Sequence, residues 1–479
     1  MRKILTSMMI LLCTSGYSQQ TMDDFFQSVR KHEIKLIAFF NQMPKGGDLH
    51  HHFAGSTYAE PMIEKAIRED FFLNTETFSV SKTDPGTASW IRFSDIIKSG
   101  QLDAMKIKIL QTWSVKDYDP SRYPSDKLFF ESFLKFWPLM DNYFVTGLIE
   151  LKNRAIKENV SYLETQLSTP INTPDVSEFY SMDETMRKSS DEKDDVKLNA
   201  LFAKLYASIL EKGAVARADS FNLFFIKKLH DSLKIDEPDF KMRYQNYVLR
   251  FMNPVDLFNN LTIAFLSADR SDLIAGVNIV SPEDGDVSMK DYELHMKMYR
   301  FFHEKFPKVK YSMHAGELTL GLVLPEELTW HINAAVKIAG AKRIGHGIDL
   351  AHEKNPFDLL RYMKKNDVAI EINPESNQFI LKVDEKNHPF PLYFNYGVPI
   401  VIGSDDAGIL RTNLSNQFVL LAKRYPFLKY SDMKKFVFNS IDYSFIKDPA
   451  VKKEVRSNLE KKFMQFEADI KKEMSFQKN

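Results

Sequence analysis

The chain has 479 residues and equal numbers of basic and acidic side chains, 64 of each, so its formal net charge is zero. It lacks the basic surplus that is typical of nucleic-acid-binding proteins, and a nucleic-acid partner is not expected. Its 38 Phe, 19 Tyr and 4 Trp residues supply enough apolar surface for a large core. The length is compatible with up to about three domains, but α/β barrels often reach it as single domains.

The N-terminus has the pattern of a secretory signal peptide. A basic start at residues 1–3 precedes an apolar run through Cys13, and small residues follow at Gly16 and Ser18. The run is too short to cross a membrane. We expect cleavage near Ser18 and a secreted or periplasmic product; the alternative is a buried N-terminal helix. Because Cys13 is the only cysteine, the mature chain would form no disulfide and offer no thiolate ligand.

Helical and extended patterns alternate along the rest of the chain. Residues 20–42 have the periodicity of an amphipathic helix. Short runs rich in β-branched residues then recur between helical stretches, at 47–52, 161–168, 221–226, 274–280, 311–317, 343–348, 368–374 and 399–405. Eight strands alternating with helices predict a (β/α)₈ TIM barrel, here extending over residues 43–450. Residues 261–268 are better read as a helix, since residues 270–273 are too few for a crossover to the parallel strand that follows.

Three segments lie outside the minimal barrel pattern. Residues 74–125 follow the first strand and contain Trp90, Phe93 and Trp113, so they predict an insertion with structure of its own. Residues 175–195 are polar and charged and predict a solvated loop. Residues 451–472 predict a charged amphipathic helix packed on the outside.

A histidine cluster ends the first predicted strand. Side chains on a strand alternate between faces, so His50 and His52 point the same way and His51 points the other way. Two imidazoles on one face suit a divalent metal such as zinc. A surface histidine run or a tag remnant is the alternative, but the apolar flank and the internal position count against it.

Other predicted strands also end in side chains that bind metals or transfer protons. The fifth ends in His314 and Glu317, the sixth in His346, and the eighth in Asp405 and Asp406. The C-terminal ends of barrel strands form the active-site face. Buried imidazoles and carboxylates are costly unless they are paired or bind a metal. Their convergence on one rim therefore indicates a catalytic metal site.

These motifs resemble those of the adenosine deaminase family, within the metal-dependent amidohydrolase barrels. In chain order they are Met43-Pro44-Lys45 with His50-x-His52, His314-Ala315-Gly316-Glu317, Gly345-His346-Gly347, Pro374-x-Ser376-Asn377 and Ser404-Asp405-Asp406. Weaker matches are Phe133-Leu134-x-x-Trp137, Tyr162-x-Glu164 and Asn439-Ser440-Ile441. The signal peptide, the Lys45-Gly46-Gly47 run and the insertion are similar to the secreted adenosine deaminase-related growth factor branch.

The resemblance implies a site with one zinc ion per chain, held by His50, His52, His314 and Asp405. Zinc makes water reactive near neutral pH by lowering its pKa to about 7. The resemblance also implies that Glu317 protonates N1 of a purine and that His346 acts as a base or orients the attacking water. Asp406 would help hold that water and accept a hydrogen bond from the purine at N7.

Other roles remain open for three carboxylates. Glu317 could instead steady a histidine ligand, and Asp406 could cap a following helix. Glu371, at the end of the seventh strand, is interpreted as structural rather than catalytic.

The chain departs from the pattern of the compact cytosolic family members at three positions. Ala54 stands where they have an Asp that contacts the sugar, and Gln166 stands where an Arg is usual. Ser281 occupies the place of a Gly whose backbone contacts purine N3, a contact that a serine backbone could still make. The metal chemistry is unaffected, but the sugar contacts are not defined.

The function expected from the sequence is hydrolytic deamination of adenosine or 2′-deoxyadenosine, giving the inosine product and ammonia outside the cytoplasm. One alternative is a related enzyme acting on adenine or a modified adenosine. Another is a non-catalytic secreted signalling or binding protein on the same barrel. The aromatic residues of the insertion predict that it covers the barrel mouth or forms a homodimer contact.

Overall fold

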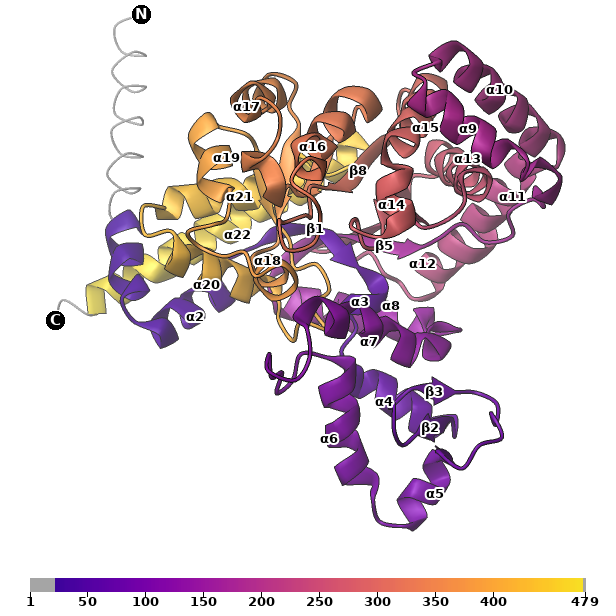
Figure 1. Cartoon of the computed structure of the whole chain (residues 1–479). Helices are drawn as coiled ribbons and strands as arrows, with labels where there is room; N and C mark the ends of the chain where they lie inside the picture. The colour runs from indigo at the N-terminus through magenta and orange to yellow at the C-terminus, as the bar shows by residue number, and fades with distance from the viewer. Residues whose placement is uncertain (1–21, 477–479) are drawn as a thin grey trace, which may run out of the picture.

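Eight parallel strands form the centre of the molecule in the computed structural model, which describes residues 22–476. The predicted signal peptide lies outside these residues. The strands pair in the order β1-β5-β6-β7-β8-β9-β10-β11, with helices around them (Figure 1). The first and last strands meet through two backbone bonds: His52 N–H donates to the Asp405 carbonyl (3.2 Å), and Asp405 N–H donates to the His50 carbonyl (2.9 Å). The result is a nearly closed (β/α)₈ barrel, as predicted.

The barrel strands are β1 (Gly46–His52), β5 (Val160–Ser168), β6 (Lys241–Leu249), β7 (Ile274–Val280), β8 (Lys310–Ala315), β9 (Arg343–His346), β10 (Ala369–Ile372) and β11 (Ile400–Ile402). The α-helices are α2 (Glu33–Gln42), α3 (Phe53–Ser56), α4 (Ala59–Arg68), α5 (Phe93–Lys98), α6 (Leu102–Trp113), α7 (Ser125–Met140), α8 (Phe144–Lys157), α9 (Met182–Asp191), α10 (Asp195–Glu211), α11 (Ala214–Ser220), α12 (Lys228–Ser232), α13 (Pro254–Arg270), α14 (Asp286–Lys290), α15 (Tyr292–Lys305), α16 (His331–Ala334), α17 (Pro356–Lys365), α18 (Pro374–Leu381), α19 (Phe390–Tyr396), α20 (Leu414–Arg424), α21 (Tyr430–Asp442) and α22 (Pro449–Phe476). None of the helices within residues 22–476 combines the length and the apolar character needed to cross a bilayer.

The third strand is not where the sequence predicted it. Residues 221–226 belong to a helical segment, Phe221–Lys227, and the third strand is β6. Phe221 and Ile226 are buried, whereas Leu223 and Phe224 are 52% and 68% exposed, which is a one-sided helical pattern. β6 escaped detection because its inward side chains are polar: Gln245 Nε2 donates to Glu164 Oε1 inside the barrel (2.7 Å).

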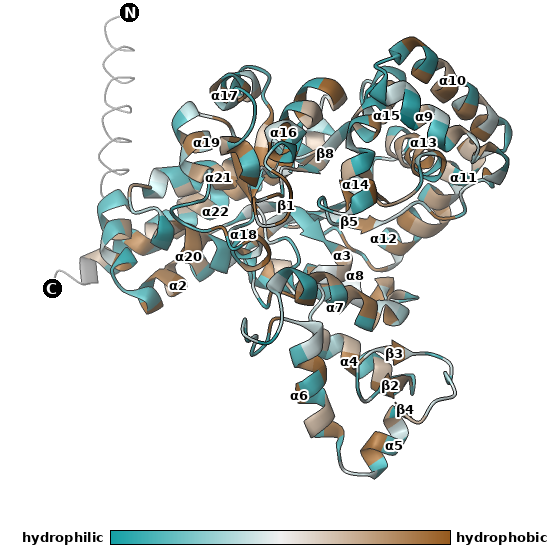
Figure 2. Ribbon diagram, in the orientation of Figure 1, coloured by the Kyte–Doolittle hydropathy of each residue, from teal (hydrophilic) through white to brown (hydrophobic). Residues whose placement is uncertain are grey.

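Two further predictions about the chain outside the strands were wrong in detail. The predicted loop at 175–195 instead contains α9, which buries Met182 and Met186 against the barrel helices. The predicted helix at 20–42 is broken near His32 into a helix at residues 22–30 and α2. The predicted helices at 261–268 and 451–472 are present as α13 and α22. Figure 2 shows both hydrophilic and hydrophobic residues along surface helices such as α10.

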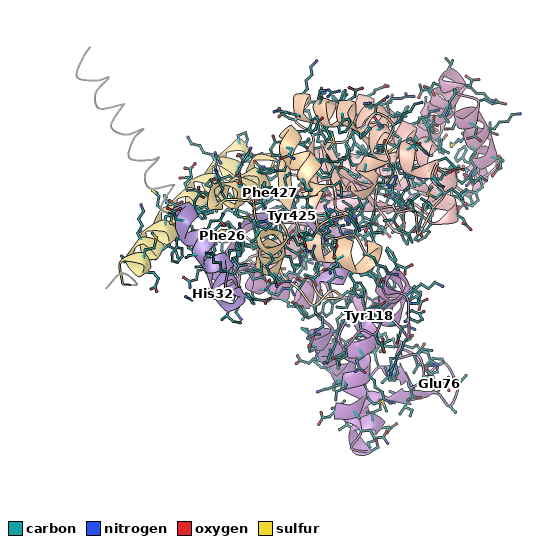
Figure 3. The ribbon with its side chains drawn as sticks, turned by 60° about the vertical axis from the view of Figure 1, so that its left-hand side comes forward. Phe26, His32, Glu76, Tyr118, Tyr425 and Phe427 are labelled. Atoms are coloured by element: carbon teal, nitrogen blue, oxygen red, sulfur yellow. The ribbon has the colours of Figure 1, made fainter. Side chains whose placement is uncertain are left out.

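The insertion forms a small unit that projects from the barrel (Figure 1). It has a three-stranded antiparallel sheet of β2 (Phe72–Asn74), β3 (Val80–Ser81) and β4 (Trp90–Arg92), with α5 and α6 beside it. Trp113 is buried and donates to the Phe78 carbonyl (2.8 Å). Figure 3 shows Tyr118 where the projection joins the rest of the molecule, and its ring packs edge-on against Phe379 of α18 at 4.9 Å. The insertion therefore ends close to the barrel mouth.

Candidate active site

The four predicted metal ligands meet at the C-terminal rim of the barrel. His50 and His52 lie on β1, His314 lies on β8, and Asp405 follows β11. Asp405 Oδ1 is 3.3 Å from His50 Nε2 and 3.2 Å from His52 Nε2, and His52 Nε2 is 3.2 Å from His314 Nε2. His51 points away, as predicted, and its Nδ1 lies 2.9 Å from Thr165 Oγ1.

Three of the separations between these donor atoms match the spacing in a divalent metal site. Tetrahedral zinc with metal–ligand distances near 2.0–2.1 Å separates its donor atoms by about 3.3 Å. Burial alone would lower the pKa of His50, but Asp405 and Glu371 raise it to about 10, so this position favours positive charge. The residues thus fit a cation such as Zn²⁺. Ligand atoms of His50, His314, His346 and Asp405 also lie within 4.8 Å of one another, so distance alone leaves His346 as a competing ligand.

Close backbone approaches make room for these side chains. A Cβ atom on Gly345 of β9 would lie 2.6 Å from Cε1 of His50, and one on Gly55 would lie 1.6 Å from Oδ1 of Asp406. Real side chains do not tolerate such distances, so glycine is required at both positions.

Glu371 hydrogen-bonds to His50, the first of the predicted ligands, and fixes its ring. It is fully buried and accepts hydrogen bonds from His50 Nδ1 (2.7 Å), Arg343 Nε (2.5 Å) and Ser312 Oγ (3.0 Å). Because His50 donates from Nδ1, its Nε2 is the atom left to bind a metal. Arg343 also donates from Nη2 to Glu164 Oε1 (2.5 Å). The carboxylate that steadies a ligand is therefore Glu371, and this is not the role of Glu317.

A second chain of hydrogen bonds sets the proton position on His314. The Glu164 carboxylate accepts from Gln245 Nε2, and Gln245 Oε1 accepts from Asn278 Nδ2 (3.1 Å). Asn278 Oδ1 then faces His314 Nδ1 at 3.1 Å. An amide oxygen can only accept, so His314 donates from Nδ1 and also presents the Nε2 lone pair. The sequence did not identify Gln245, because the third strand was misplaced.

Glu283 supports the segment that carries Glu317. Its Oε1 accepts from Gly316 N (3.1 Å) and from His331 Nδ1 (2.6 Å), and its Oε2 accepts from Glu317 N (2.9 Å). Arg250 lies beside Glu283 and donates from Nη2 to the His314 carbonyl (2.8 Å). Burial raises the pKa of Glu317 well above its usual value, and Asp405 and Glu283 raise it further. This environment favours the protonated form of the Glu317 carboxyl.

Asp406 is buried beside the ligands and caps no helix, since the next helix, α20, has Asn413 as its N-cap. Burial raises the pKa of Asp406 well above its usual value, and Asp405 raises it further. Burial and Asp406 also raise the pKa of Tyr247 on β6 to about 12. Sequence reasoning missed Tyr247 for the same reason as Gln245.

The three positions that depart from the compact pattern lie near this centre. Ser281 follows β7 with φ +89°, a backbone conformation that favours glycine. Gln166 Nε2 is 3.2 Å from His52 Nε2. Ala54 lies on α3, directly after the β1 ligands.

A cavity of about 260 Å³ opens beside Glu317. One wall comes from α7, the helix that follows the insertion, through Asp126, Lys127 and Phe130. The predicted contribution of residues 74–125 to the mouth is thus replaced, in this cavity, by the adjoining helix.

The structure is that of a (β/α)₈ barrel protein with a buried His/Asp group at its C-terminal rim that could hold a metal ion. The adenosine deaminase family model matches residues 227–462. The chain is 26% identical over 425 residues to an adenosine deaminase of Aedes albopictus, covering 83% of this chain and 68% of that one. It is 24% identical over 455 residues to an adenosine deaminase of Phlebotomus duboscqi, covering 89% and 77%. The chain belongs to the adenosine deaminase family.

Solved structures share the fold at low identity. An amidohydrolase from Burkholderia ambifaria with bound Zn superposes with a TM-score of 0.56 and 16% identity, covering 91% of this chain and 94% of that one. The N6-mAMP deaminase of Arabidopsis superposes with a TM-score of 0.54 and 17% identity, covering 88% and 99%.

Proposed function

We propose that the protein is a zinc-dependent deaminase that hydrolyses adenosine or 2′-deoxyadenosine to the inosine product and ammonia. The observation that carries the proposal is the convergence of His50, His52, His314 and Asp405, whose donor atoms lie 3.2–3.3 Å apart in three pairs, beside Glu317, whose pKa is raised. When bound, zinc would make water reactive enough to attack C6. Deamination also requires a proton donor for the ring and contacts that orient it, and the surrounding residues can supply these.

Glu317 gives its proton to purine N1 as C6 is attacked, since its raised pKa favours the protonated carboxyl. Asp406 would hydrogen-bond the purine at N7. Adenine N7 carries a lone pair and no hydrogen, so Asp406 must donate this bond rather than accept it. Its raised pKa favours the protonated carboxyl that this donation requires. The Ser281 backbone would contact N3.

The cavity favours an uncharged nucleoside over a nucleotide. Besides Glu317, the proposed proton donor, its walls carry four acidic residues against one basic side chain, Lys127; the four are Asp126, Glu131, Glu283 and Asp284. A 5′-phosphate brings about −2 charge and would be repelled by this excess of carboxylates. Adenosine is thus expected to have a much larger kcat/KM than AMP, and a free adenine base would leave the cavity unfilled.

The test is the loss of adenosine absorbance with purified, zinc-loaded protein, together with metal analysis. Chelation and Glu317→Gln should each abolish turnover. Glu150→Gln changes another largely buried carboxyl with a raised pKa, on α8, and should leave turnover intact. The proposal would be refuted if the protein turned over none of adenosine, deoxyadenosine, adenine and N6-methyladenosine.

Action outside the cytoplasm belongs to the same proposal and is supported by the signal-peptide pattern of residues 1–18. N-terminal sequencing of the protein recovered from the culture medium or periplasm should begin just after Ser18. A cell-associated product that still begins at Met1 would contradict it.

A further inference from the structure

His346 is the ionisable residue at the site whose role depends on where its proton sits. Its Nε2 lies 3.6 Å from Glu317 Oε1 and 3.9 Å from Asp405 Oδ2, so this nitrogen faces the reacting space. With a lone pair on Nε2, His346 could bind the metal or accept a proton. With a hydrogen on Nε2, it can only donate.

The proton position can be traced from a backbone group whose direction is fixed. Phe390 N–H, at the start of α19, donates to His388 Nδ1 at 3.0 Å. A backbone N–H cannot accept, so His388 Nδ1 must carry the lone pair. The proton of the neutral His388 ring is therefore on Nε2.

The same logic orients the next side chain. His388 Nε2 faces Asn377 Oδ1 at 3.1 Å, and only the amide oxygen can accept this proton. The Asn377 amide nitrogen consequently faces His346 Nδ1, at 2.9 Å, and donates to it. Nδ1 of His346 therefore carries the lone pair, and its proton is on Nε2.

Burial makes this arrangement hard to reverse. His388, Asn377 and His346 are 4%, 0% and 1% exposed, so solvent is not free to take over a lost hydrogen bond. Moving the proton of His346 to Nδ1 would set two donors against each other in a dry site, which is costly. His50 and His314 have the opposite arrangement, because each donates from Nδ1 to an oxygen.

We infer that His388 and Asn377 lock His346 in the Nε2–H form, so that His346 donates a hydrogen bond to the attacking water. It then neither binds the metal nor removes a proton from that water. His388 and Asn377 are positioning residues that act through His346. The step involving water rests on the proposed function, whereas the proton position does not.

Asn377→Asp provides the decisive variant because it changes little in shape and reverses the proton. A carboxylate would accept from both His388 Nε2 and His346 Nδ1, so a neutral His346 would carry its lone pair on Nε2. We expect kcat to fall about 10- to 100-fold, with KM and metal content nearly unchanged. Unchanged or increased kcat would mean that His346 works as a base and would overturn the inference.

Variants of His388 distinguish an effect of the hydrogen-bond relay from His388 through Asn377 to His346 from an effect of simple packing. His388→Gln keeps an acceptor for Phe390 N–H and a donor for Asn377 at similar spacing, so it should retain most of the activity. His388→Phe should lose kcat to the same extent as Asn377→Asp. His295→Phe removes another fully buried imidazole, on α15 and outside the relay, and should leave kcat unchanged. Equal kcat for His388→Gln and His388→Phe would contradict the relay.

The proton itself can be located by neutron diffraction, or by ¹⁵N NMR of histidine-labelled full-length protein with its metal bound. The expected result is hydrogen on Nε2 of His346 and on Nδ1 of His50 and His314. Hydrogen on Nδ1 of His346 would overturn the inference, whatever the protein turns over. Hydrogen on Nε2 in a protein that deaminates nothing would count against the proposed function alone.

Discussion

Replacing Glu371 by Gln tests whether the buried carboxylate under the barrel rim serves the metal site or only the fold. Glu371 accepts from His50 Nδ1 and Arg343 Nε at once, with no solvent exposure. Glutamine has nearly the same shape but loses the charge and one acceptor. The glutamine NH₂ group would then face either His50 Nδ1 or the Arg343 guanidinium, and both of these groups are donors.

The size of the stability effect follows from the pKa of Glu371. Burial alone would raise this pKa, but Arg343 and His50 outweigh it and lower the pKa from 4.5 to about 2. A lowering of this size corresponds to about 3 kcal/mol of folding free energy at neutral pH. Because the folded pKa is depressed, the contribution is present above pH 4.5 and is lost as the pH falls toward 2. Breaking a buried ion pair typically costs a similar 3–5 kcal/mol.

The assay combines urea unfolding of the metal-free protein at neutral pH with zinc competition against a coloured chelator. Glu371→Gln should lose about 3 kcal/mol of stability and bind zinc about 10- to 100-fold more weakly. Asp291→Asn is the matched control, since Asp291 is a buried carboxylate paired with Arg187 away from the site. It should lose stability but keep zinc affinity. If both variants bound zinc as the wild type does, Glu371 would be purely structural.

Three further predictions concern the acid side of the site. The raised pKa of Glu317, caused first by burial, means that kcat should fall as the pH rises through that pKa, because only the protonated form donates; a kcat that increases with pH on the alkaline side would refute this role. Glu283→Gln should lower kcat about tenfold or more, with KM unchanged, whereas Glu353→Gln, a buried carboxyl that bonds the start of α16 and not Glu317, should leave kcat unchanged. Gly55→Ala should displace Asp406, reduce kcat/KM and cost about 1–3 kcal/mol in thermal unfolding; wild-type kinetics would show that this close approach is dispensable.

The strands that carry chemistry were the ones the sequence predicted well. β7 matches its predicted bounds, and β1, β5 and β8 agree to within two residues at each end. Each of these runs is apolar or ends in a distinctive polar motif, so its signal is local. β6 has neither property, because its middle contains the buried polar residues Gln245 and Asn246. Buried polar residues of this kind are stabilised by hydrogen-bond partners on other strands, and a short stretch of sequence does not reveal those partners.

The same distinction explains which site residues were found. His314 and Glu317 stand within four residues of each other and form a recognisable motif. The groups that set their chemistry, Asn278 and Glu283, come from the end of another strand, and His388 lies in a loop between helices. Their functions depend on distances across the barrel, which no periodicity encodes.

Backbone strain at the C-terminal rim of the barrel gives a physical reason for the hydrogen bonds that support the site residues. Ser281, His346 and Asp405 adopt φ values of +89°, +67° and +57°, a region that residues with a Cβ avoid. Each such residue costs about 1–3 kcal/mol unless the surroundings over-determine it. Asp405 is fixed on both sides by its backbone bonds to β1, and His346 is fixed through Nδ1 by Asn377. The hydrogen bonds that hold protons in place at this site therefore also hold its strained backbone, so a variant that releases one should disturb both.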